Sequence, residues 1–226
     1  MHLLILGRGK TGSLVAEVAR ARRHHVSVMS GAENPNATAL TVDALATTDV
    51  VIDFTTPTAV VANAEACIRA KKNFVVGTTG WNDQVPRLRE LVASAKTGFL
   101  YGSNFSIGVN LFFEIVATAG CALKYEYSGQ IFERHHALKK DAPSGTAVML
   151  QGIVQDAART ELEITSFREG EVVGMHELVL DSPCDTIYVC HDAKSRRGFA
   201  EGAVQAAEWL NGKKGFFDFK DVWRKL

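Results

Sequence analysis

The sequence has no net charge, because 25 lysine and arginine residues balance 25 aspartate and glutamate residues. A neutral chain has no overall electrostatic attraction to nucleic acid or to an acidic membrane surface, so any anion-binding site must be local. The 226 residues are 46% hydrophobic and 22% charged, a balance typical of a globular protein with a buried core.

Cysteines are few, and their spacing excludes two common motifs. The four cysteines, Cys67, Cys121, Cys184 and Cys190, form no C-x-x-C pair, which argues against a zinc ribbon or a thioredoxin-like site. Each lies in an apolar stretch, so we expect each to be a small buried side chain.

The sequence also lacks clear membrane-targeting segments. Its start has no basic region, and the apolar run at 3–6 is too short for a signal peptide. The most apolar stretch, 98–123, is interrupted by Asn104, Asn110 and Glu114, and we expect it not to span a membrane. These absences favour a soluble protein of the reducing cytoplasm, with no nucleic-acid or membrane partner.

The first part of the chain alternates short apolar runs with helical stretches. Strands are expected at 3–6, 26–29, 50–54, 74–77 and 99–101, with helices ending near 23 and covering 58–70 and 82–96. This alternation predicts βαβ units and a parallel sheet.

The pattern changes after Asn104. Helices are expected at 109–123 and 144–160, and strands at 128–133, 163–167, 176–180 and 186–191. They indicate an α+β domain on a mostly antiparallel or mixed sheet. A helix at 200–210 follows, which we expect to pack on the first domain, and the chain ends in a short aromatic tail.

A glycine loop, Gly7-Arg8-Gly9-Lys10-Thr11-Gly12, follows the first predicted strand and opens the first helix. This context is typical of a dinucleotide-binding loop. Gly7 permits the tight turn, Gly9 lets backbone approach a pyrophosphate, and Gly12 allows close packing of helix on strand. The helix start offers free N–H groups to the anion. The alternative is a tight strand-to-helix turn that binds no ligand.

The choice of dinucleotide depends on the end of the second strand. A site that prefers NAD usually carries an acid there, but this position is near Ser30 and Gly31, with no acid before Glu33. Arg8 and Lys10 could meet the 2′-phosphate of NADPH, which favours that cofactor. Both are equally explained as solvated loop cations.

Two further turns follow predicted parallel strands, Asp53-Phe54-Thr55-Thr56-Pro57 and Gly77-Thr78-Thr79-Gly80. Ligands of open α/β sheets bind at the carboxyl ends of the strands. Hydroxyl side chains and glycines there can donate hydrogen bonds to a nicotinamide ribose. Together with the glycine loop, the two turns outline one crevice.

The richest stretch in chemically active side chains is 133–147, E-R-H-H-A-L-K-K-D-A-P-S-G-T-A. His135 and His136 would face opposite ways in a continuing strand, so they can serve one site only near a strand end or in a loop. Histidine is well suited to proton transfer near neutral pH. Lys139 and Lys140 add positive charge.

The end of the same stretch reads as the start of a helix. Pro143 suits a first helical turn, and the N–H groups of Ser144, Gly145 and Thr146 would then be free to bind a carboxylate. The alternative for the whole stretch is a basic surface loop followed by an ordinary capped helix.

This stretch resembles the signature E-x-H-H-x-x-K-x-D-x-P-S-G-T-A of the 4-hydroxy-tetrahydrodipicolinate reductases of lysine and diaminopimelate synthesis. The likeness covers nearly the whole chain, including D-F-T at 53–55, G-T-T-G at 77–80, S-N-F-S-I-G-V-N at 103–110, R-E-G-E-V-V-G-M-H at 168–176 and H-D-A-K-S-R-R-G-F-A-E-G-A at 191–203.

The resemblance implies a role for each matching residue. His135 would donate or accept a proton, and Lys139 would be a second proton donor, acting on the substrate nitrogen. His136, with Ser144, Gly145 and Thr146, would bind the dicarboxylate. The cofactor site would comprise the glycine loop with Phe54, Gly77, Thr78, Thr79, Gly102, Ser103, Asn104 and Phe105. No metal is implied.

The implied fold is α/β, an N-terminal Rossmann-like dinucleotide-binding domain with an inserted α+β substrate and oligomerisation domain on a mixed sheet. Residues 1–104 plus 196–226 would form the first domain and 105–195 the second. The family usually forms a homotetramer through its substrate domains. Its reaction delivers hydride from NADH or NADPH to a cyclic dicarboxylate imine precursor, with loss of water.

The sequence departs from the family in three ways. It is short between the second and third strands, it has Thr11 where methionine is usual, and it lacks the usual cofactor-discriminating residue after the second strand. All three concern the cofactor site, so they leave the choice of nucleotide open.

Three other functions compete with this interpretation. The chain could be a reductase of the same architecture acting on another small dicarboxylate or imine, or a cofactor sensor without catalysis. A metal hydrolase using His135, His136 and His191 lacks the usual helical histidine spacing.

Overall fold

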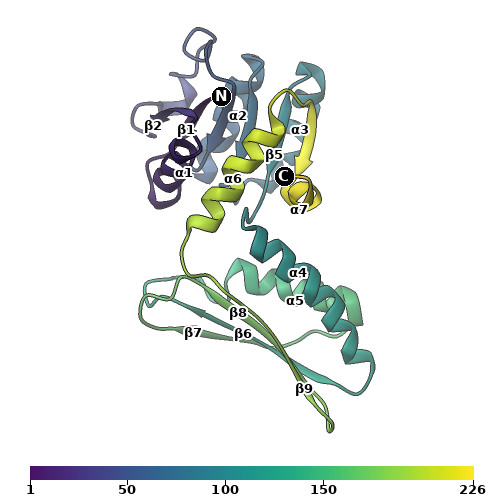
Figure 1. Ribbon diagram of the computed structural model, residues 1–226. Helices are drawn as coiled ribbons and strands as arrows, with labels where there is room; N and C mark the ends of the chain where they lie inside the picture. Colours follow the sequence, from purple (N-terminus) through teal and green to yellow (C-terminus); the bar gives the residue numbers. More distant parts are fainter. The chain divides into compact units, whose positions relative to one another are not determined.

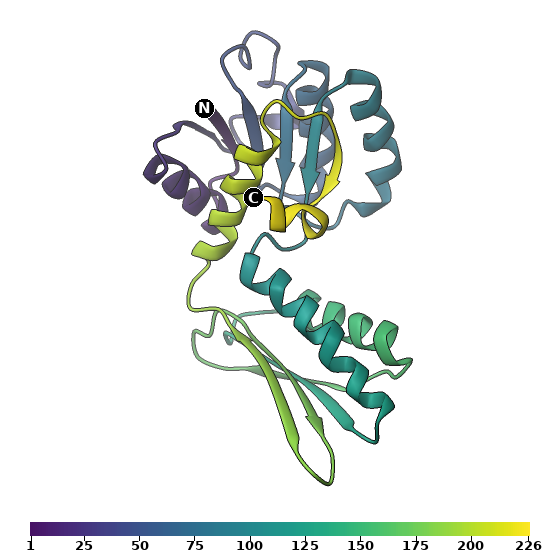
Figure 2. The same cartoon turned by 45° about the vertical axis from the view of Figure 1, so that its right-hand side comes forward.

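The computed structural model describes residues 1–226, and the chain forms two compact units (Figures 1 and 2). The first unit comprises Met1–Ile107 and Arg197–Leu226, and the second comprises Gly108–Arg196. The assignment of cofactor binding to one part and substrate binding to the other stays a prediction.

The first unit is built on a six-stranded sheet in the order β10-β5-β4-β3-β1-β2. Its strands are β1 (His2–Leu6), β2 (His25–Met29), β3 (Val50–Asp53), β4 (Asn73–Val76), β5 (Gly98–Tyr101) and β10 (Gly215–Asp218). Every neighbouring pair is parallel, which confirms the predicted α/β class. The short aromatic tail, for which no element was predicted, forms β10, which extends the sheet beside β5, and α7 (Phe219–Val222), which follows it.

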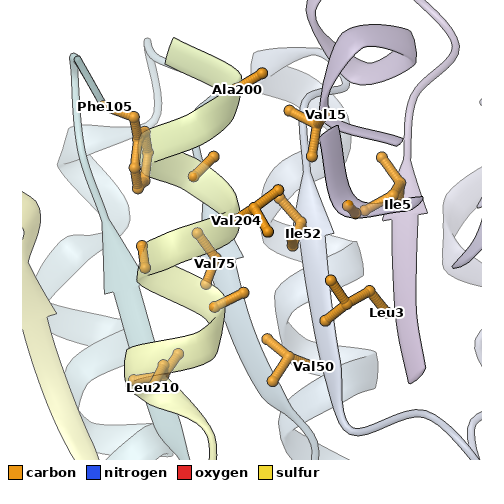
Figure 3. Packing of buried hydrophobic residues seen from close by; sticks show 14 of the residues in the cluster. Leu3, Ile5, Val15, Val50, Ile52, Val75, Phe105, Ala200, Val204 and Leu210 are labelled. Atoms are coloured by element: carbon orange, nitrogen blue, oxygen red, sulfur yellow. The ribbon is translucent and has the colours of Figure 1, made fainter. Parts of the chain in front are cut away.

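Helices cover both faces of this sheet. They are α1 (Lys10–Ala21), α2 (Pro57–Arg69), α3 (Val85–Ala95) and α6 (Arg197–Leu210). On one face, Ile5 and Ile52 pack in one apolar cluster with Val15 of α1 and Val204 of α6 (Figure 3). The alternate strand residues pack in a second cluster with α2 and α3. Strands buried on both faces read as continuous apolar runs, which is why the sequence predicted them well.

The second unit is a four-stranded sheet in the order β7-β6-β8-β9 with helices on one face. Its elements are α4 (Ile107–Ala119), β6 (Ser128–His135), α5 (Gly145–Ala158), β7 (Ile164–Arg168), β8 (Met175–Asp181) and β9 (Thr186–Asp192). β6 and β7 are parallel and the other pairs antiparallel, so the predicted mixed sheet is confirmed. Phe112 of α4 and Leu150 of α5 share its core with Ile131 and Leu178.

Four short 3-10 helices complete the chain, at Pro35–Ala37, Asn82–Gln84, Gly120–Lys124 and Trp223–Lys225. The third of them continues α4, and the combined segment Ile107–Lys124 is long and apolar enough to cross a membrane by length and composition alone. One such helix is weak evidence for a membrane span, and 28% of this segment, including Val116, is buried within the chain.

The expectation that all cysteines are buried is wrong for two of them. Cys67 is buried, and Cys121 is half-buried. Cys184 is exposed in the turn between β8 and β9, and Cys190 is exposed on β9. Alternation along β9 places Cys190 opposite His191, on the sheet face that the helices leave open.

Candidate functional site

The glycine loop combines residues that the fold requires with one that it does not. Gly7 has a φ of +105°, and a Cβ there would lie 2.4 Å from the carbonyl oxygen of Phe54. A Cβ on Gly12 would lie 2.2 Å from the carbonyl oxygen of Gly7. Gly9, the N-cap of α1, has ordinary dihedral angles and nothing within 4 Å of its Cβ position. Open space beside Gly9 therefore fits a ligand that approaches the backbone.

The start of α1 fits the phosphates of a dinucleotide. The first N–H groups of a helix have no intrahelical acceptor and carry partial positive charge. The first turn contains no acidic side chain, and Gly9 caps the helix without a side-chain hydrogen bond. An anion would therefore meet free donors here without competition from a carboxylate of the same turn.

Asp53 joins the two turns at the carboxyl edge of the sheet. Its carboxylate accepts hydrogen bonds from the Thr55 N–H at 2.8 Å, the Asn63 side chain at 2.8 Å and the Thr78 hydroxyl at 3.2 Å. Burial raises the pKa of Asp53, and these hydrogen bonds act in the opposite direction. The structure thus brings the Asp53–Pro57 and Gly77–Gly80 turns together.

Phe54 and Phe105 pack between these turns and the segment after β5. A Cβ on Gly77 would lie 2.2 Å from the Phe54 ring, whose centre is 6.2 Å from that of Phe105. A Cβ on Gly102 would lie 2.8 Å from the Cβ of Phe219. Phe105 is 2% exposed, so it belongs to the core of the first unit.

The remaining predicted cofactor residues are more open. Ser103 and Thr79 are exposed, Thr11 and Asn104 are half-buried, and Lys10 is exposed at the start of α1. Their roles toward the cofactor remain predictions.

An acid does lie at the end of β2, contrary to the sequence interpretation. The turn after β2 brings Glu33 back to Ser30, whose N–H and hydroxyl both donate to the Glu33 carboxylate at 2.7 Å. These two hydrogen bonds lower the pKa of Glu33, with a smaller contribution from Arg8. Arg8 reaches the other carboxylate oxygen at 3.2 Å. An exposed acid and an exposed base therefore share the position that normally contacts the adenosine ribose.

In the second unit, α5 begins one residue later than expected. Ser144 is the N-cap, and its hydroxyl accepts a hydrogen bond from the Ala147 N–H at 3.2 Å. Pro143 precedes this cap instead of opening the helix. The Ser144 N–H donates to Glu133 at 3.0 Å, so the expectation that it is free for a ligand is wrong. Gly145 and Thr146 follow in the first turn, where N–H groups have no intrahelical partner.

The Glu133 carboxylate, fully buried on β6, organises this region. Its Oε1 accepts from the Ser144 N–H, from the Ser166 hydroxyl at 2.6 Å and from Arg168 Nη2 at 2.7 Å. Burial alone would raise the pKa of Glu133, but these hydrogen bonds outweigh it and lower the pKa to about 2. The carboxylate is therefore charged at neutral pH.

Two histidines lie beside this carboxylate. Nδ1 of His135 is 3.0 Å from Glu133 Oε2, and Nε2 of His176 is 3.9 Å from the same oxygen and 3.1 Å from the Ser144 hydroxyl. Burial lowers the pKa of His135, and burial with the neighbouring His135 lowers the pKa of His176 to about 4. β6 ends at His135, so His136 lies just past the strand end, where the alternation relaxes.

The loop after β6 holds Lys139 and is tied to the same network. Lys139 Nζ lies 2.8 Å from both oxygens of Asp141, and this ion pair lowers the pKa of Asp141. Arg168 Nη2 donates to the Asp141 carbonyl oxygen at 2.6 Å as well as to Glu133. The structure thus links the lysine loop, His135 and the start of α5 through Arg168 and Glu133.

The sequence interpretation gave no role to Glu133, Arg168 or His176. One signal was available for Glu133, because residues two apart on a strand share a face and Glu133 precedes His135 by two. Arg168 and His176 are brought in by the pairing of β7 and β8 with β6, which the sequence did not specify.

The parallel sheet, the glycine loop and the inserted mixed sheet define a Rossmann-type two-domain protein of the dinucleotide-dependent oxidoreductase class. Within that class, the chain belongs to the dihydrodipicolinate reductase family. Family models for dihydrodipicolinate reductase match residues 1–105 with the N-terminal part and residues 108–223 with the C-terminal part.

Individual relatives agree over the full length. The chain is 38% identical to the 4-hydroxy-tetrahydrodipicolinate reductase of Christiangramia forsetii, over 100% of this chain and 99% of the relative. It is 33% identical to that of Neisseria meningitidis serogroup A, over 95% and 93%. Among solved structures, a dipicolinate-bound dihydrodipicolinate reductase from Paenisporosarcina sp. TG-14 has the same fold, with a TM-score of 0.80, 22% identity, and coverage of 98% and 99%.

The two glycines of the loop predict opposite effects of substitution. Gly9→Ala meets only open space, so the melting temperature should stay near that of the wild type while dinucleotide affinity falls at least ~10-fold, about 1.4 kcal/mol. Gly7→Ala, with a positive φ and a backbone clash, should lower stability itself. Thermal melting with calorimetric NADPH and NADH titrations measures both. Unchanged affinity in folded Gly9→Ala would contradict a ligand at this position.

The buried neutral His176 predicts a pH-dependent stability of the second unit. Its folded pKa of about 4 lies below the unfolded value of ~6.5, so the unfolded chain binds the proton first and stability falls as pH drops below ~6.5. We expect a loss of about 2 kcal/mol between pH 7 and pH 5 in native-state hydrogen exchange of β6 and β8. Protonation of Glu133 lowers the stability further, but only as the pH falls below about 4.5, the pKa of an unfolded glutamate.

The matched variants are His176→Gln, which should reduce this dependence to the part that His135 and His191 contribute, and His25→Gln, an exposed control on β2 that should leave it unchanged. An identical pH slope in the wild type and in His176→Gln would show that His176 is not the source.

Proposed function

We propose that this chain reduces 4-hydroxy-tetrahydrodipicolinate with a nicotinamide dinucleotide, in lysine and diaminopimelate biosynthesis. The observation that carries the proposal is the full-length match, at 38% and 33% identity, to relatives named for this reaction. The cluster of His135, Lys139 and the start of α5 supports it, because an anionic substrate needs positive charge and proton donors. The relatives do not favour the alternative of a different small dicarboxylate or imine.

The chain's own residues supply protons and bind the anion. The cofactor, when bound, supplies a hydride, and the overall change consumes one proton and releases the hydroxyl group as water. His135 exchanges a proton with the reacting substrate, and Lys139 donates one to the substrate nitrogen. His136 and the N–H groups of Gly145 and Thr146 hold a carboxylate at the start of α5. Ser144 contributes by capping that helix, since its own N–H serves Glu133.

The preferred cofactor is NADPH. The proposal rests on Arg8 and Lys10, two basic side chains that flank Gly9, the glycine of the loop that has open space beside it. Arg8 already pairs with Glu33, so a 2′-phosphate would compete with that carboxylate for the guanidinium. The 2′-hydroxyl of NADH would instead donate to Glu33.

The enzyme acts as a cytoplasmic homotetramer assembled through its second unit. Large apolar side chains support such an interface on the open face of that unit's sheet. Tyr188 of β9 is 68% exposed and Phe167 of β7 is 41% exposed. Light scattering of the purified protein measures the subunit number.

The first functional prediction concerns the two proton-transfer residues. His135→Ala and Lys139→Ala should each lower kcat at least ~100-fold, as expected for removal of a general acid, with little change in dinucleotide affinity. The measurement is loss of reduced-nicotinamide absorbance with 4-hydroxy-tetrahydrodipicolinate generated in situ from pyruvate and aspartate semialdehyde. Near-normal turnover in both variants would remove these assignments. No substrate-dependent oxidation by the folded wild type would refute the proposed reaction.

The second functional prediction separates NADPH from NADH. Arg8→Ala should lower kcat/KM for NADPH about 10-fold or more and change NADH little, because one charge-assisted contact is worth ~1.5–3 kcal/mol. Glu33→Gln should do the reverse, lowering kcat/KM for NADH and sparing NADPH. Equal losses for both cofactors in Arg8→Ala would contradict a 2′-phosphate contact.

A further inference from the structure

On the helix-covered face of the second sheet, the side chains change from apolar to ionisable along the strands. Ile131 of β6 and Leu178 of β8 pair across the sheet in the apolar core. One pleat further along, Glu133 pairs with His176, which in turn pairs with His191 of β9. A row of ionisable side chains therefore crosses the sheet where β6 approaches its end.

Within this row, only one oxygen of Glu133 is saturated. Oε1 accepts from the Ser144 N–H, the Ser166 hydroxyl and Arg168 Nη2, which come from α5 and β7. These three donors fix the plane of the carboxylate. Oε2 is then presented to His135, whose Nδ1 lies 3.0 Å away.

Glu133 Oε2 and His135 Nδ1 are both buried and neither has a hydrogen-bond partner in the structure, although they lie only 3.0 Å apart. Buried polar atoms without partners are rare and costly. A carboxylate oxygen can only accept, and an imidazole Nδ1 can either donate or accept. A proton on Nδ1, directed at Oε2, is the one arrangement of the neutral ring in which these two neighbouring atoms can satisfy each other.

His176 does not displace His135 from this oxygen. Its Nε2 is farther from Oε2, at 3.9 Å, and lies 3.1 Å from the Ser144 hydroxyl. With a pKa lowered to about 4 by burial and by His135, His176 is uncharged at neutral pH. It therefore forms no ion pair with the Glu133 carboxylate at neutral pH.

The opposite edge of the His135 ring faces a glycine. A Cβ on Gly174, just before β8, would lie 3.0 Å from His135 Nε2 and 3.3 Å from Cδ2. Any larger residue at 174 would press on the ring nitrogen that is free to react. The two sides of the ring are thus distinct, one held by a carboxylate and one kept clear.

We propose that Glu133 is the positioning residue for His135, accepting the Nδ1 proton so that Nε2 is the atom that exchanges a proton with the substrate. The inference rests on the proposed function of His135 and adds the atom that reacts and the group that orients it. Glu133 itself does not touch the substrate, since its two oxygens are turned to the protein interior.

The charges around His135 agree with this arrangement. Burial lowers the pKa of His135, and Lys139 and Arg168 act in the same direction, whereas Glu133 and Asp141 raise it. His176 faces the ring edge-on at 5.0 Å between ring centres, and His191 lies beyond it on β9. Glu133 is the anion in contact with the ring, so it offsets the cations and keeps the ring protonatable.

A metal ion is a weaker explanation of the same three side chains. Glu133, His135 and His176 each offer a ligand atom, all within 4.8 Å of one another. Arg168, however, already places a cation 2.7 Å from the carboxylate, and Lys139 adds charge that lowers the pKa of both histidines. A second cation here would meet strong repulsion at low dielectric.

The test is the tautomer of His135, read from two-bond ¹H–¹⁵N spectra of histidine-labelled enzyme at a pH where the ring is neutral. The His135→Gln spectrum assigns its signals. We expect the Nδ1–H form in the wild type. In Glu133→Gln, the amide carbonyl oxygen should take the place of Oε1 and accept from the same three donors. The amide NH2 group then faces Nδ1 of His135 and donates to it, so the ring proton should move to Nε2. A wrong tautomer should lower kcat at least ~100-fold with little change in KM.

Two further variants keep the result interpretable. Glu161→Gln, exposed before β7, is the matched control and should change neither tautomer nor kcat. Gly174→Ala leaves Glu133 intact and should lower kcat while the Nδ1–H form persists, which tests the free edge even if Glu133→Gln fails to fold.

An Nε2–H tautomer in the wild type would overturn the proposal. So would an unchanged tautomer and near-normal kcat in folded Glu133→Gln, or loss of wild-type activity on chelation that zinc restores. The tautomer is measured without substrate, so its outcome is independent of the proposed reaction, which fails separately if His135→Gln turns over normally.

Discussion

The ion pair between the buried carboxylate of Glu133 and Arg168 is the interaction on which the second unit's chemistry depends. An isolated carboxylate in this position would be strongly unfavourable, and three donors on one oxygen offset that cost. The same donors come from the start of α5, from β7 and from a guanidinium that also holds the Asp141 carbonyl. The same hydrogen bonds therefore stabilise the charge of Glu133 and fix the positions of the helix start, the lysine loop and the His135 ring. A neutral residue at 133 would leave those donors with a weaker acceptor.

The first unit shows how far periodicity alone can lead. Its central strands β1, β3, β4 and β5 are buried on both faces and appear as apolar runs, and these four strands and the edge strand β2 were predicted. β10 was missed because Gly215–Asp218 is short and half-buried at the sheet edge, where an aromatic run has no distinctive period. The glycine loop lies between β1 and α1 as predicted, but Gly7 and Gly12 are required by backbone packing whatever the ligand. Only the open space at Gly9 separates a binding loop from a plain turn, and it is invisible in the sequence.

Long-range pairing explains what the sequence could not reveal about the candidate site. Alternation predicted the mixed sheet, and the condition that His135 and His136 lie at a strand end is met at the end of β6. The partners of Glu133, however, come from 144, 166 and 168, and only the register of β6 with β7 and the position of α5 bring them together. That is why the Ser144 N–H seemed free. Glu33 shows the same effect over a shorter distance in sequence, because the turn after β2 brings its carboxylate back to the N–H of Ser30.

The two buried histidines show how one environment separates two roles. Burial disfavours the charged form of both rings. His176 lies mid-row, with its Nε2 nearest the Ser144 hydroxyl, and burial and its neighbour keep it neutral. His135 lies at the strand end, where it meets a carboxylate on one edge and the missing side chain of Gly174 on the other. A ring that exchanges protons needs both a partner that stabilises its charged form and an unobstructed nitrogen. Of the two histidines, only His135 has both, so its position in the sheet supports the proposed proton-transfer role as much as its residue type does.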